Sequence, residues 1–375
     1  MTNVLIINAG SSTIRFALFT SGRPPQRLLD GKMERIGSAD SFMDWLESQP
    51  IGKFGAVGHR VVHGMLHTAP ERVTDELLDE LRGITPYDPE HLPREIQLIE
   101  AVRRRYPEVP QVVCFDTAFH RTMPQVATQL PIPRRYAAKG VQRYGFHGLS
   151  YTFLMGELAR LGDPAAAHGR VILAHLGSGA SLAAVRDGRC IDTSMGFTPT
   201  AGLVMGTRSG DLDPGLMSYL ALTEGMSAAQ FQTMVNHESG LIGVSETSAD
   251  VRELLQRETD DPRAAQALAL FCHQAKKWIG AFAAVLGGVD TLVFAGGIGE
   301  NAPPLRKRIC ADLQFLGIEI DDERNGCNAE RISAASAAVA VRVIRTDEES
   351  VIAGLTIGLL KFQPTGDPGT CKDRP

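Results

Sequence analysis

Two short apolar runs near the start of the chain are separated by a few small residues. Residues 4–8 form an apolar run that ends at Asn8. The small residues Ala9-Gly10-Ser11-Ser12 then interrupt the pattern, and residues 13–19 resume it. Runs of β-branched and aromatic residues on either side of small residues are typical of two strands joined by a tight turn. The pattern therefore predicts a β-hairpin in this region.

The same pattern returns in the middle of the chain. Residues 171–175 are apolar up to His175, Leu176-Gly177-Ser178-Gly179 follows, and residues 180–185 form the next apolar run. Asn8-x-Gly10-Ser11 then aligns with His175-x-Gly177-Ser178 as a short internal repeat. Two such hairpins, each followed by alternating helices and strands, predict a duplicated α/β domain with a cleft between its copies.

Helical periodicity fills the segments between the predicted strands. Thr74 precedes an amphipathic segment that ends at Gly83, and Pro93 opens a second one. Asp261-Pro262 begins a long, largely apolar segment that Gly287-Gly288 ends. Capping residues or a proline at the start of each segment, and glycines at the end of the first and third, predict three helices.

The last third of the chain contains a further strand and a final helix. Residues 291–295 are apolar and run into Gly296-Gly297-Ile298-Gly299, which predicts a buried strand followed by a glycine-rich turn. The final helix is expected from Thr346 to Leu360. Thr346 and Glu349 have the spacing of a capping box, which predicts a structural role for Glu349.

Composition and charge narrow the functional classes. The 375 residues suffice for two domains, and 43% hydrophobic with 22% charged residues is ordinary for a soluble globular protein. The net charge of -5 gives no basic excess, so we expect no nucleic-acid partner. The sequence shows neither a signal peptide nor an apolar run long enough for a bilayer, so we expect no membrane partner. Six scattered cysteines without metal-type spacing suggest a reduced, cytoplasmic protein.

Three glycine-rich segments are candidate phosphate sites. They are residues 8–15, 175–179 and 296–301. Small residues let backbone N–H groups approach an anion, and hydroxyl groups and Arg15 add donors and positive charge. Each segment has an ordinary structural interpretation as a tight turn, and GxG patterns alone prove little. No Walker GxxxxGK[ST] or protein-kinase motif is present, so a phosphotransferase here would belong to neither class.

Several charged or polar residues stand at predicted strand ends or between glycines. Arg60 lies in GHRVVHG, Asp116 in FDTAFH, His147 in RYGFHG and Arg208 in GTRSGD. Taken singly, each has a structural alternative: a helix cap for the aspartate, a packed core residue for the histidine, and ion pairs for the arginines. Their joint occurrence at strand ends and glycine turns favours a functional site. Glu348 adds a carboxylate that could hold Mg²⁺ through water.

Taken together, these blocks resemble the acetate kinase family. The matching stretches span nearly the whole chain in the order NAGSST, GHRVVHG, FDTAFH, RYGFHG, HLGSGAS, DTSMGFTP, GLVMGTRSGDLDPG, AGGIGEN and TDEE. The resemblance implies an α/β fold of two duplicated ribonuclease-H-like domains, as in the actin, sugar-kinase and heat-shock-chaperone superfamily, with an active-site cleft between them. It implies a first domain of residues 1–148 plus a returning segment at about 350–375, and a second domain of residues 149–349.

The resemblance also implies a cofactor and phosphate contacts. Asn8 and Glu348 would bind Mg²⁺, or Mn²⁺ in its place. Ser11, Thr13 and Arg15 would lie near the phosphates.

The remaining site residues also come from the resemblance. Arg60 would hold the substrate carboxylate beside an apolar wall that includes Val62 and Pro199. The catalytic residues would be Asp116, His147 and Arg208. The ATP contacts would be His175, Leu176, Gly177, Ser178, Gly179, Asp250, Val251, Arg252, Gly297, Ile298, Gly299, Glu300 and Asn301.

The implied reaction is the reversible transfer of the γ-phosphate of ATP to acetate, which gives acetyl phosphate and ADP, in a homodimer. A carboxylate is already ionised near pH 7, so the obstacle is repulsion between two anions rather than a missing base. Arg60 would orient the carboxylate, His147 and Arg208 would bind the transferring phosphoryl group, and Asp116 would orient an arginine or a metal-bound water.

Three alternatives remain open at this point. A propionate or butyrate kinase differs only in acyl-chain length, and a methylene in an apolar pocket is worth about 1–3 kcal/mol. A polyol or sugar kinase would need a general base and would not need Arg60. A non-catalytic nucleotide-binding module would keep the glycine turns but not Arg60, His147 and Arg208 together.

Several positions depart from the family pattern. Arg15 stands where lysine is frequent, and Ser178 replaces the asparagine of HLGNG. Ala201 replaces a common glutamate, and Tyr151 a histidine. Residues 86–91 read PYDPEH in place of LHNP. These changes keep the reaction type and leave the acyl-chain preference open.

Overall fold

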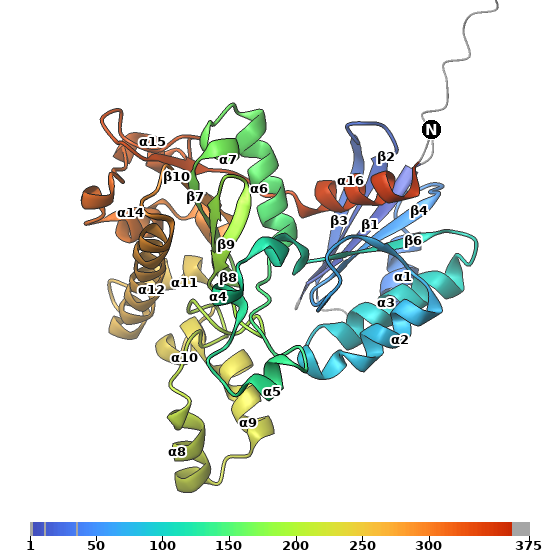
Figure 1. Cartoon of the computed structure of the whole chain (residues 1–375), viewed down its shortest axis with the longest axis horizontal. Coiled ribbons are helices and arrows are strands. Elements are labelled where there is room, and N and C mark those ends of the chain that lie inside the picture. Colours follow the sequence, from blue (N-terminus) through green and yellow to red (C-terminus); the bar gives the residue numbers. More distant parts are fainter. Residues whose placement is uncertain (1–2, 11–12, 35–36, 362–375) are drawn as a thin grey trace, which may run out of the picture. The chain divides into compact units, whose positions relative to one another are not determined.

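The computed structural model describes residues 3–10, 13–34 and 37–361, which form two compact units (Figure 1). The first unit holds the described residues up to Phe115 together with those from Asp347 onward, and the second runs from Asp116 to Thr346. The structural boundary thus precedes the boundary expected at residue 148. The reason is that the segment after Phe115 bonds to the second sheet, for example through Thr122 Oγ1, which donates to the Cys190 carbonyl at 3.0 Å.

The sheet of the first unit has the strand order β3-β2-β1-β4-β6-β5. Strands β1 to β3 pair antiparallel, whereas β4 and β6 run parallel to β1. The strands are β1 (Asn3–Ala9), β2 (Thr13–Thr20), β3 (Arg27–Glu34), β4 (Ala56–Val61), β5 (Glu71–Arg72) and β6 (Gln111–Phe115).

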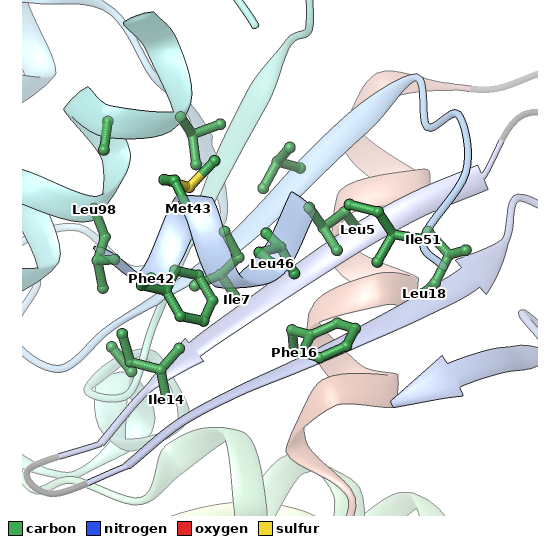
Figure 2. Close-up of a cluster of buried hydrophobic side chains, with 14 residues drawn as sticks. Leu5, Ile7, Ile14, Phe16, Leu18, Phe42, Met43, Leu46, Ile51 and Leu98 are labelled. Carbon is green, nitrogen blue, oxygen red and sulfur yellow. The ribbon is translucent and has the colours of Figure 1, made fainter. Parts of the chain in front are cut away.

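Alternating side chains of this sheet pack into two helical layers. Leu5 and Ile7 of β1 join a buried cluster with α1 (Ala39–Glu47) and α3 (Leu92–Arg105), which Figure 2 shows around Phe42. Gly58 of β4 meets α16 (Glu348–Leu360) instead, and a β-carbon there would overlap Thr356. A helix from the far end of the chain therefore covers this unit.

The sheet of the second unit has the order β11-β10-β7-β8-β9. Strands β7 to β9 pair antiparallel, and β10 and β11 are parallel to β7. Figure 1 shows α6 (Gly148–Arg160) and α12 (Pro262–Leu286) on opposite sides of this sheet. The strands are β7 (Arg170–Leu176), β8 (Ala180–Arg186), β9 (Arg189–Thr193), β10 (Thr291–Ala295) and β11 (Ala340–Val343).

The two sheets share one topology. Each contains three antiparallel strands in chain order and two parallel strands added beside the first strand, and the first sheet has β5 in addition, antiparallel to β6. Asn8 and His175 are both the second-last residue of that first strand, and each precedes a glycine-containing turn. The predicted duplication and the ribonuclease-H-like fold are therefore confirmed.

The predicted helix ends follow the expected capping rules. Thr74 accepts a hydrogen bond from the Leu77 amide at the start of α2 (Asp75–Gly83). Asp261 caps α12, and Gly287 ends it with a φ of 72°. The shorter helices are η1 (Thr85–Tyr87), η2 (Ala118–Thr122), α4 (Gln125–Thr128), α5 (Arg134–Ala137), α7 (Ala165–His168), α8 (Gly215–Glu224), α9 (Ala228–Thr233), η3 (Met234–Glu238), α10 (Gly240–Ser245), α11 (Val251–Arg257), α13 (Gly296–Asn301), α14 (Pro303–Cys310), η4 (Gln314–Leu316) and α15 (Asp322–Gly326).

Two local predictions were wrong. Residues 296–301 form the short helix α13 rather than an open turn. Asp347, not Thr346, caps α16 by accepting a hydrogen bond from the Ser350 amide at 3.0 Å. The Thr346 hydroxyl bonds to Ser150 instead, at 2.9 Å. Within the described ranges, no helix has both the length and the apolar character needed to cross a membrane.

Candidate active site

His147 sits in a strained turn at the start of α6. Its backbone is left-handed, with φ 58° and ψ 23°, a conformation that costs a non-glycine residue about 1–2 kcal/mol. The next residue, Gly148, donates its amide to the Asp116 carbonyl at 2.9 Å, and a β-carbon at Gly148 would overlap that oxygen. Close backbone packing at Asp116 therefore stabilises the strained conformation of His147.

A buried histidine supports the same turn. His120 is 2% exposed, and its Nε2 lies 2.9 Å from the Phe146 carbonyl. Burial lowers the pKa of His120 from 6.5 to about 4, so the ring is neutral near pH 7. Because a carbonyl can only accept, Nε2 carries the proton and donates, and Nδ1 is left to contact the Cys190 thiol at 3.2 Å. The FDTAFH motif does not show where its histidine points, so this role was not predictable from the sequence.

The imidazole of His147 is held by two neighbours. Its Nδ1 lies 2.9 Å from the Ser181 hydroxyl, which also has a short hydrogen bond with the buried Tyr151 hydroxyl. The ring stacks on His175 with centroids 4.2 Å apart, and Nδ1 of His175 lies 2.8 Å from the Ser150 hydroxyl. Serine contacts at both Nδ1 atoms orient the Nε2 edges toward the turn between β7 and β8.

Arg208 reaches the same turn as His147. A β-carbon built on Gly179 would lie 3.3 Å from Nε2 of His147 and 3.6 Å from Nη1 of Arg208. The guanidinium is oriented by its hydrogen bond to the Pro199 carbonyl, 2.9 Å from Nη1. Two of the three predicted catalytic residues therefore flank one glycine. Asp116, the third, is fully buried and contacts the His147 turn through its backbone.

The predicted ATP-binding segments adjoin one another within the second unit. The Gly206 amide donates to the Ser178 carbonyl at 3.1 Å, and a β-carbon on Gly206 would lie 3.5 Å from the Ala249 carbonyl. A β-carbon on Gly177 would lie 3.8 Å from the Gly297 amide nitrogen. The turn after β7, the start of α11 and the start of α13 thus form one continuous region.

Not every residue predicted in this region is placed to contact a ligand through its side chain. Leu176 and Val251 are buried in the core. Asp250 caps α11 and forms an ion pair with Arg252 at 2.6 Å. Glu300 Oε1 accepts hydrogen bonds from the Gly296 amide at 3.0 Å and the Thr346 amide at 3.1 Å.

The other predicted residues of α13 lie at its surface or support it. Asn301 donates to the Gly297 carbonyl at 3.0 Å, Ile298 is half-buried and Gly299 is buried. Below the helix, the fully buried Arg306 donates to the Gly299 carbonyl at 2.7 Å, and burial lowers the pKa of its guanidinium to about 10. Arg306 was not predictable as a site residue, since nothing in the local sequence pattern marks it as buried.

The first unit contains an oxygen-rich cluster at the end of β1. The side-chain amide of Asn8 donates to Glu348 Oε2 at 3.0 Å and to Glu349 Oε1 at 2.9 Å. Both hydrogens of the side-chain amide thereby bond to carboxylates, so the side-chain oxygen of Asn8 points away from Glu348 and Glu349. Burial, and then the neighbouring Glu348 carboxylate, raise the pKa of Glu349. Glu349 therefore belongs to this cluster rather than to a capping box.

This cluster fits a hard divalent cation. Mg²⁺ prefers oxygen ligands, keeps several waters, and is commonly held by one or two carboxylates plus substrate phosphates. A cation between the Glu348 and Glu349 carboxylates would offset both the burial of Glu349 and the repulsion by Glu348, which together raise the pKa of Glu349. Within the described ranges, no group of three or more His, Cys, Asp or Glu residues forms a complete metal-binding cluster. A cation here would accordingly complete its shell with water and phosphate oxygens.

The other predicted residues of the first unit lie near the turn after β1. Arg60 Nη1 donates to the Ala9 carbonyl at 3.1 Å. The Thr13 carbonyl accepts from the Gly10 amide at 2.8 Å, and Arg15 pairs with Asn8 across the hairpin. Ser11 lies outside the described residues.

The predicted apolar wall contains one residue from each unit. Val62 is buried, and its amide donates to the Glu95 carboxylate at 3.1 and 3.2 Å. Pro199 is buried in the second unit. The common wall of Val62 and Pro199, and the convergence of Arg60 with His147 and Arg208, stay predictions.

The chain folds into two ribonuclease-H-like units. In one unit, basic and imidazole groups face a glycine turn, and the other unit holds the oxygen-rich cluster. Together these features define a kinase of the actin-like superfamily. A family model described as the acetokinase family matches residues 48–354. The chain belongs to the acetokinase family.

Individual relatives are similar over almost their whole length. An acetate kinase of Rhodopseudomonas palustris is 40% identical over 385 residues, which cover 93% of this chain and 96% of the relative. A propionate kinase of Citrobacter rodentium is 41% identical over 385 residues, which cover 93% and 95%. The crystal structure of Porphyromonas gingivalis acetate kinase superimposes with a TM-score of 0.87 at 33% identity, covering 96% of this chain and 100% of the other.

Proposed function

We propose that this protein is an acetate kinase, which transfers the γ-phosphate of ATP reversibly to acetate. One observation carries the proposal beyond family membership: Nε2 of His147 and Nη1 of Arg208 face the same glycine, Gly179. A guanidinium and an imidazole beside a glycine turn suit a trigonal phosphoryl group, whose charge spreads over its equatorial oxygens during transfer.

The reaction is limited by charge repulsion. Acetate is ionised near pH 7, so a general base is not required to create the nucleophile. Arg60 holds the acetate carboxylate, and the apolar wall of Val62 and Pro199 contacts its methyl group. Arg208 and His147 bind the oxygens of the phosphoryl group, which lowers the repulsion between the two reactants. Asp116 positions the His147 turn through its backbone, and its carboxylate would orient an arginine or, with Mg²⁺ bound, a water molecule.

The nucleotide lies along the continuous region of the second unit. The glycines of residues 177–179 and 297–299 allow the phosphates to approach the backbone, and His175 adds a donor. Asn8 and Glu348 would hold Mg²⁺ (or Mn²⁺), with Glu349 beside them, and Thr13, Arg15 and Ser11 would lie near the phosphates. Bound there, the cation neutralises charge on the phosphates of ATP.

Two assays on the same protein test the activity. Release of ADP is measured with acetate, propionate, butyrate and glycerol as acceptors, and acyl phosphate is trapped as the hydroxamate. We expect Mg²⁺-dependent ADP release with acetate, matched by an equal amount of hydroxamate. ADP release with glycerol and none with carboxylates would refute the proposal.

The same acceptor panel tests acyl-chain preference. Both an acetate kinase and a propionate kinase are about equally similar to this chain. We propose acetate as the preferred acceptor, with kcat/KM above that for propionate and butyrate. Because one methylene is worth about 1–3 kcal/mol, the expected ratio is roughly 5–150-fold per methylene. A higher kcat/KM for propionate would reassign the substrate.

The protein is also proposed to form a homodimer through α8. All residues of α8 are at least partly exposed, and Tyr219 and Leu222 are 61% and 88% exposed. Apolar helix surfaces of this kind are typical of protein contacts. Light scattering should give a dimer for the wild type and for Leu66→Glu, a control at a leucine that is 78% exposed, but a monomer for Leu222→Glu. A monomeric wild type, or a dimeric Leu222→Glu variant, would contradict the assignment.

A cytoplasmic location is proposed from the cysteines. The described residues contain five free thiols, of which Cys114, Cys190, Cys272 and Cys310 are buried. Unpaired buried thiols are typical of proteins from reducing compartments.

A further inference from the structure

The side chain of Arg143 holds three successive carbonyl groups. Its Nη1 lies 3.1 Å from the Thr193 oxygen, 3.3 Å from the Ser194 oxygen and 2.9 Å from the Met195 oxygen. One nitrogen with two hydrogens thus serves three acceptors, whose oxygens all lie within 3.3 Å of it. Without a cation between them these carbonyls would repel, because each C=O carries a partial negative charge on oxygen.

The backbone joins the same two segments just beyond this contact. The amides of Tyr144 and Gly145 both donate to the Gly196 carbonyl, at 3.0 and 3.3 Å. Arg143 is therefore the charged end of a longer connection between residues 143–145 and residues 193–196. Arg143 is half-buried, so solvent only partly screens the interaction.

Each connected segment leads directly to one catalytic group. Four residues after Arg143 the chain reaches His147, whose left-handed backbone depends on how this turn is held. Four residues after Met195 it reaches Pro199, whose carbonyl accepts the hydrogen bond that orients Arg208. The relative position of the imidazole and the guanidinium thus depends on the distance between these two segments.

We propose that Arg143 is a positioning residue for phosphoryl transfer: by bonding to the carbonyls of Thr193, Ser194 and Met195 it keeps His147 and Arg208 at the spacing that one phosphoryl group requires. This inference rests on the proposed function and adds a residue to it. Arg143 does not touch the reacting atoms itself. Its effect is therefore on alignment in the transition state rather than on the affinity for substrates.

The test compares Arg143→Ala and Arg143→Lys with the matched control Arg189→Ala. Arg189 is an exposed arginine on β9, the strand that ends at Thr193. We expect kcat of Arg143→Ala to fall about 10–100-fold, as small misalignments distant from the chemistry can do, while both KM values stay within about threefold. The lysine variant should keep most of kcat, because an ammonium group also donates to several carbonyls. Millimolar guanidinium chloride should raise kcat of the alanine variant several-fold.

A second measurement does not depend on turnover. The histidine ring resonances of the ligand-free protein are recorded, with His147 assigned by its loss in His147→Gln. The His147 resonance should shift or broaden in Arg143→Ala and stay unchanged in Arg189→Ala. This readout separates the inference from the proposed function, which fails if the wild type itself makes no acyl phosphate.

Three outcomes would overturn the inference. The first is a kcat for Arg143→Ala within threefold of the control variant. The second is a loss of activity that only follows a loss of folded protein, measured by thermal unfolding, and that neither lysine nor guanidinium restores. The third is an unchanged His147 resonance in Arg143→Ala.

Discussion

Replacing Gly179 with alanine places one methyl group between the two proposed phosphate-binding side chains. The new β-carbon would lie 3.3 Å from Nε2 of His147, 3.5 Å from its Cε1 and 3.6 Å from Nη1 of Arg208. Gly179 is not among the glycines with positive φ, so alanine can adopt its backbone conformation. The perturbation is therefore confined to the space beside these groups.

The expected magnitude follows from these distances. Carbon atoms pack best about 3.5–4.0 Å from their neighbours, so the His147 ring has to shift by only a few tenths of an ångström. The free energy of unfolding should consequently stay within about 1 kcal/mol of the wild type. Transition-state donors must lie about 2.7–3.1 Å from the developing oxyanion, however, and the methyl group covers that approach. We expect kcat to fall roughly 10²–10³-fold.

The assay measures kcat for acetyl phosphate formation and urea unfolding on the same protein preparation. Gly156→Ala is the control, because Gly156 lies on α6 of the same unit with open space around its β-carbon position. That control should be fully active and more stable by about 0.5–1 kcal/mol. A Gly179→Ala variant with wild-type kcat would show that His147 and Arg208 do not bind the phosphoryl group at this turn.

Two further predictions concern the buried groups of each unit. Below pH 6.5 the unfolded chain takes up a proton at His120 that the folded protein, with a pKa of about 4 there, does not. The free energy of unfolding should therefore fall as pH drops from 6.5 to 4, and this residue should contribute about 3 kcal/mol of that fall. Urea unfolding should show a shallower fall with pH in His120→Gln than in the wild type. An equal dependence of the unfolding free energy on pH in the two proteins would contradict the assignment. Glu349→Gln removes a charge beside Asn8, so the affinity for Mn²⁺, measured by electron paramagnetic resonance, should weaken about 10–100-fold. The control Asp30→Asn, at an exposed residue, should leave the affinity unaltered. Equal affinities in the two variants would exclude Glu349 from the cation site.

Sequence patterns predicted local structure well where the determinants are local. Asp261 before Pro262 and Gly287 after Leu286 define both ends of α12, because a cap needs only neighbouring residues. The repeat of Asn8 and His175 at equivalent strand ends was recognisable for the same reason, since hairpin geometry is encoded within about ten residues.

The failures concern partners that are distant in sequence. Thr346 has the spacing of a cap but bonds to Ser150, and the carboxylate of Glu349 bonds to Asn8 at the other end of the chain. Arg143 contacts carbonyls about fifty residues away. A single sequence carries no signal for such contacts, because only the completed fold brings these groups together.

His147 and Arg208 were predictable as candidates but not as neighbours. Each stands in a short stretch with a glycine on either side, which marks a possible ligand site. Their common orientation toward Gly179 arises from the strained turn before α6 and from the Pro199 carbonyl, which are properties of the folded chain.

Single-turnover transfer from ATP to acetate in Arg208→Ala tests the central claim most directly, with ADP affinity measured on the same protein. The account predicts that the transfer rate falls about 10³–10⁵-fold, the range found for arginines that stabilise transferring phosphoryl groups, while ADP affinity changes less than about threefold. A transfer rate within tenfold of the wild type, or a loss explained entirely by weaker nucleotide binding, would contradict it.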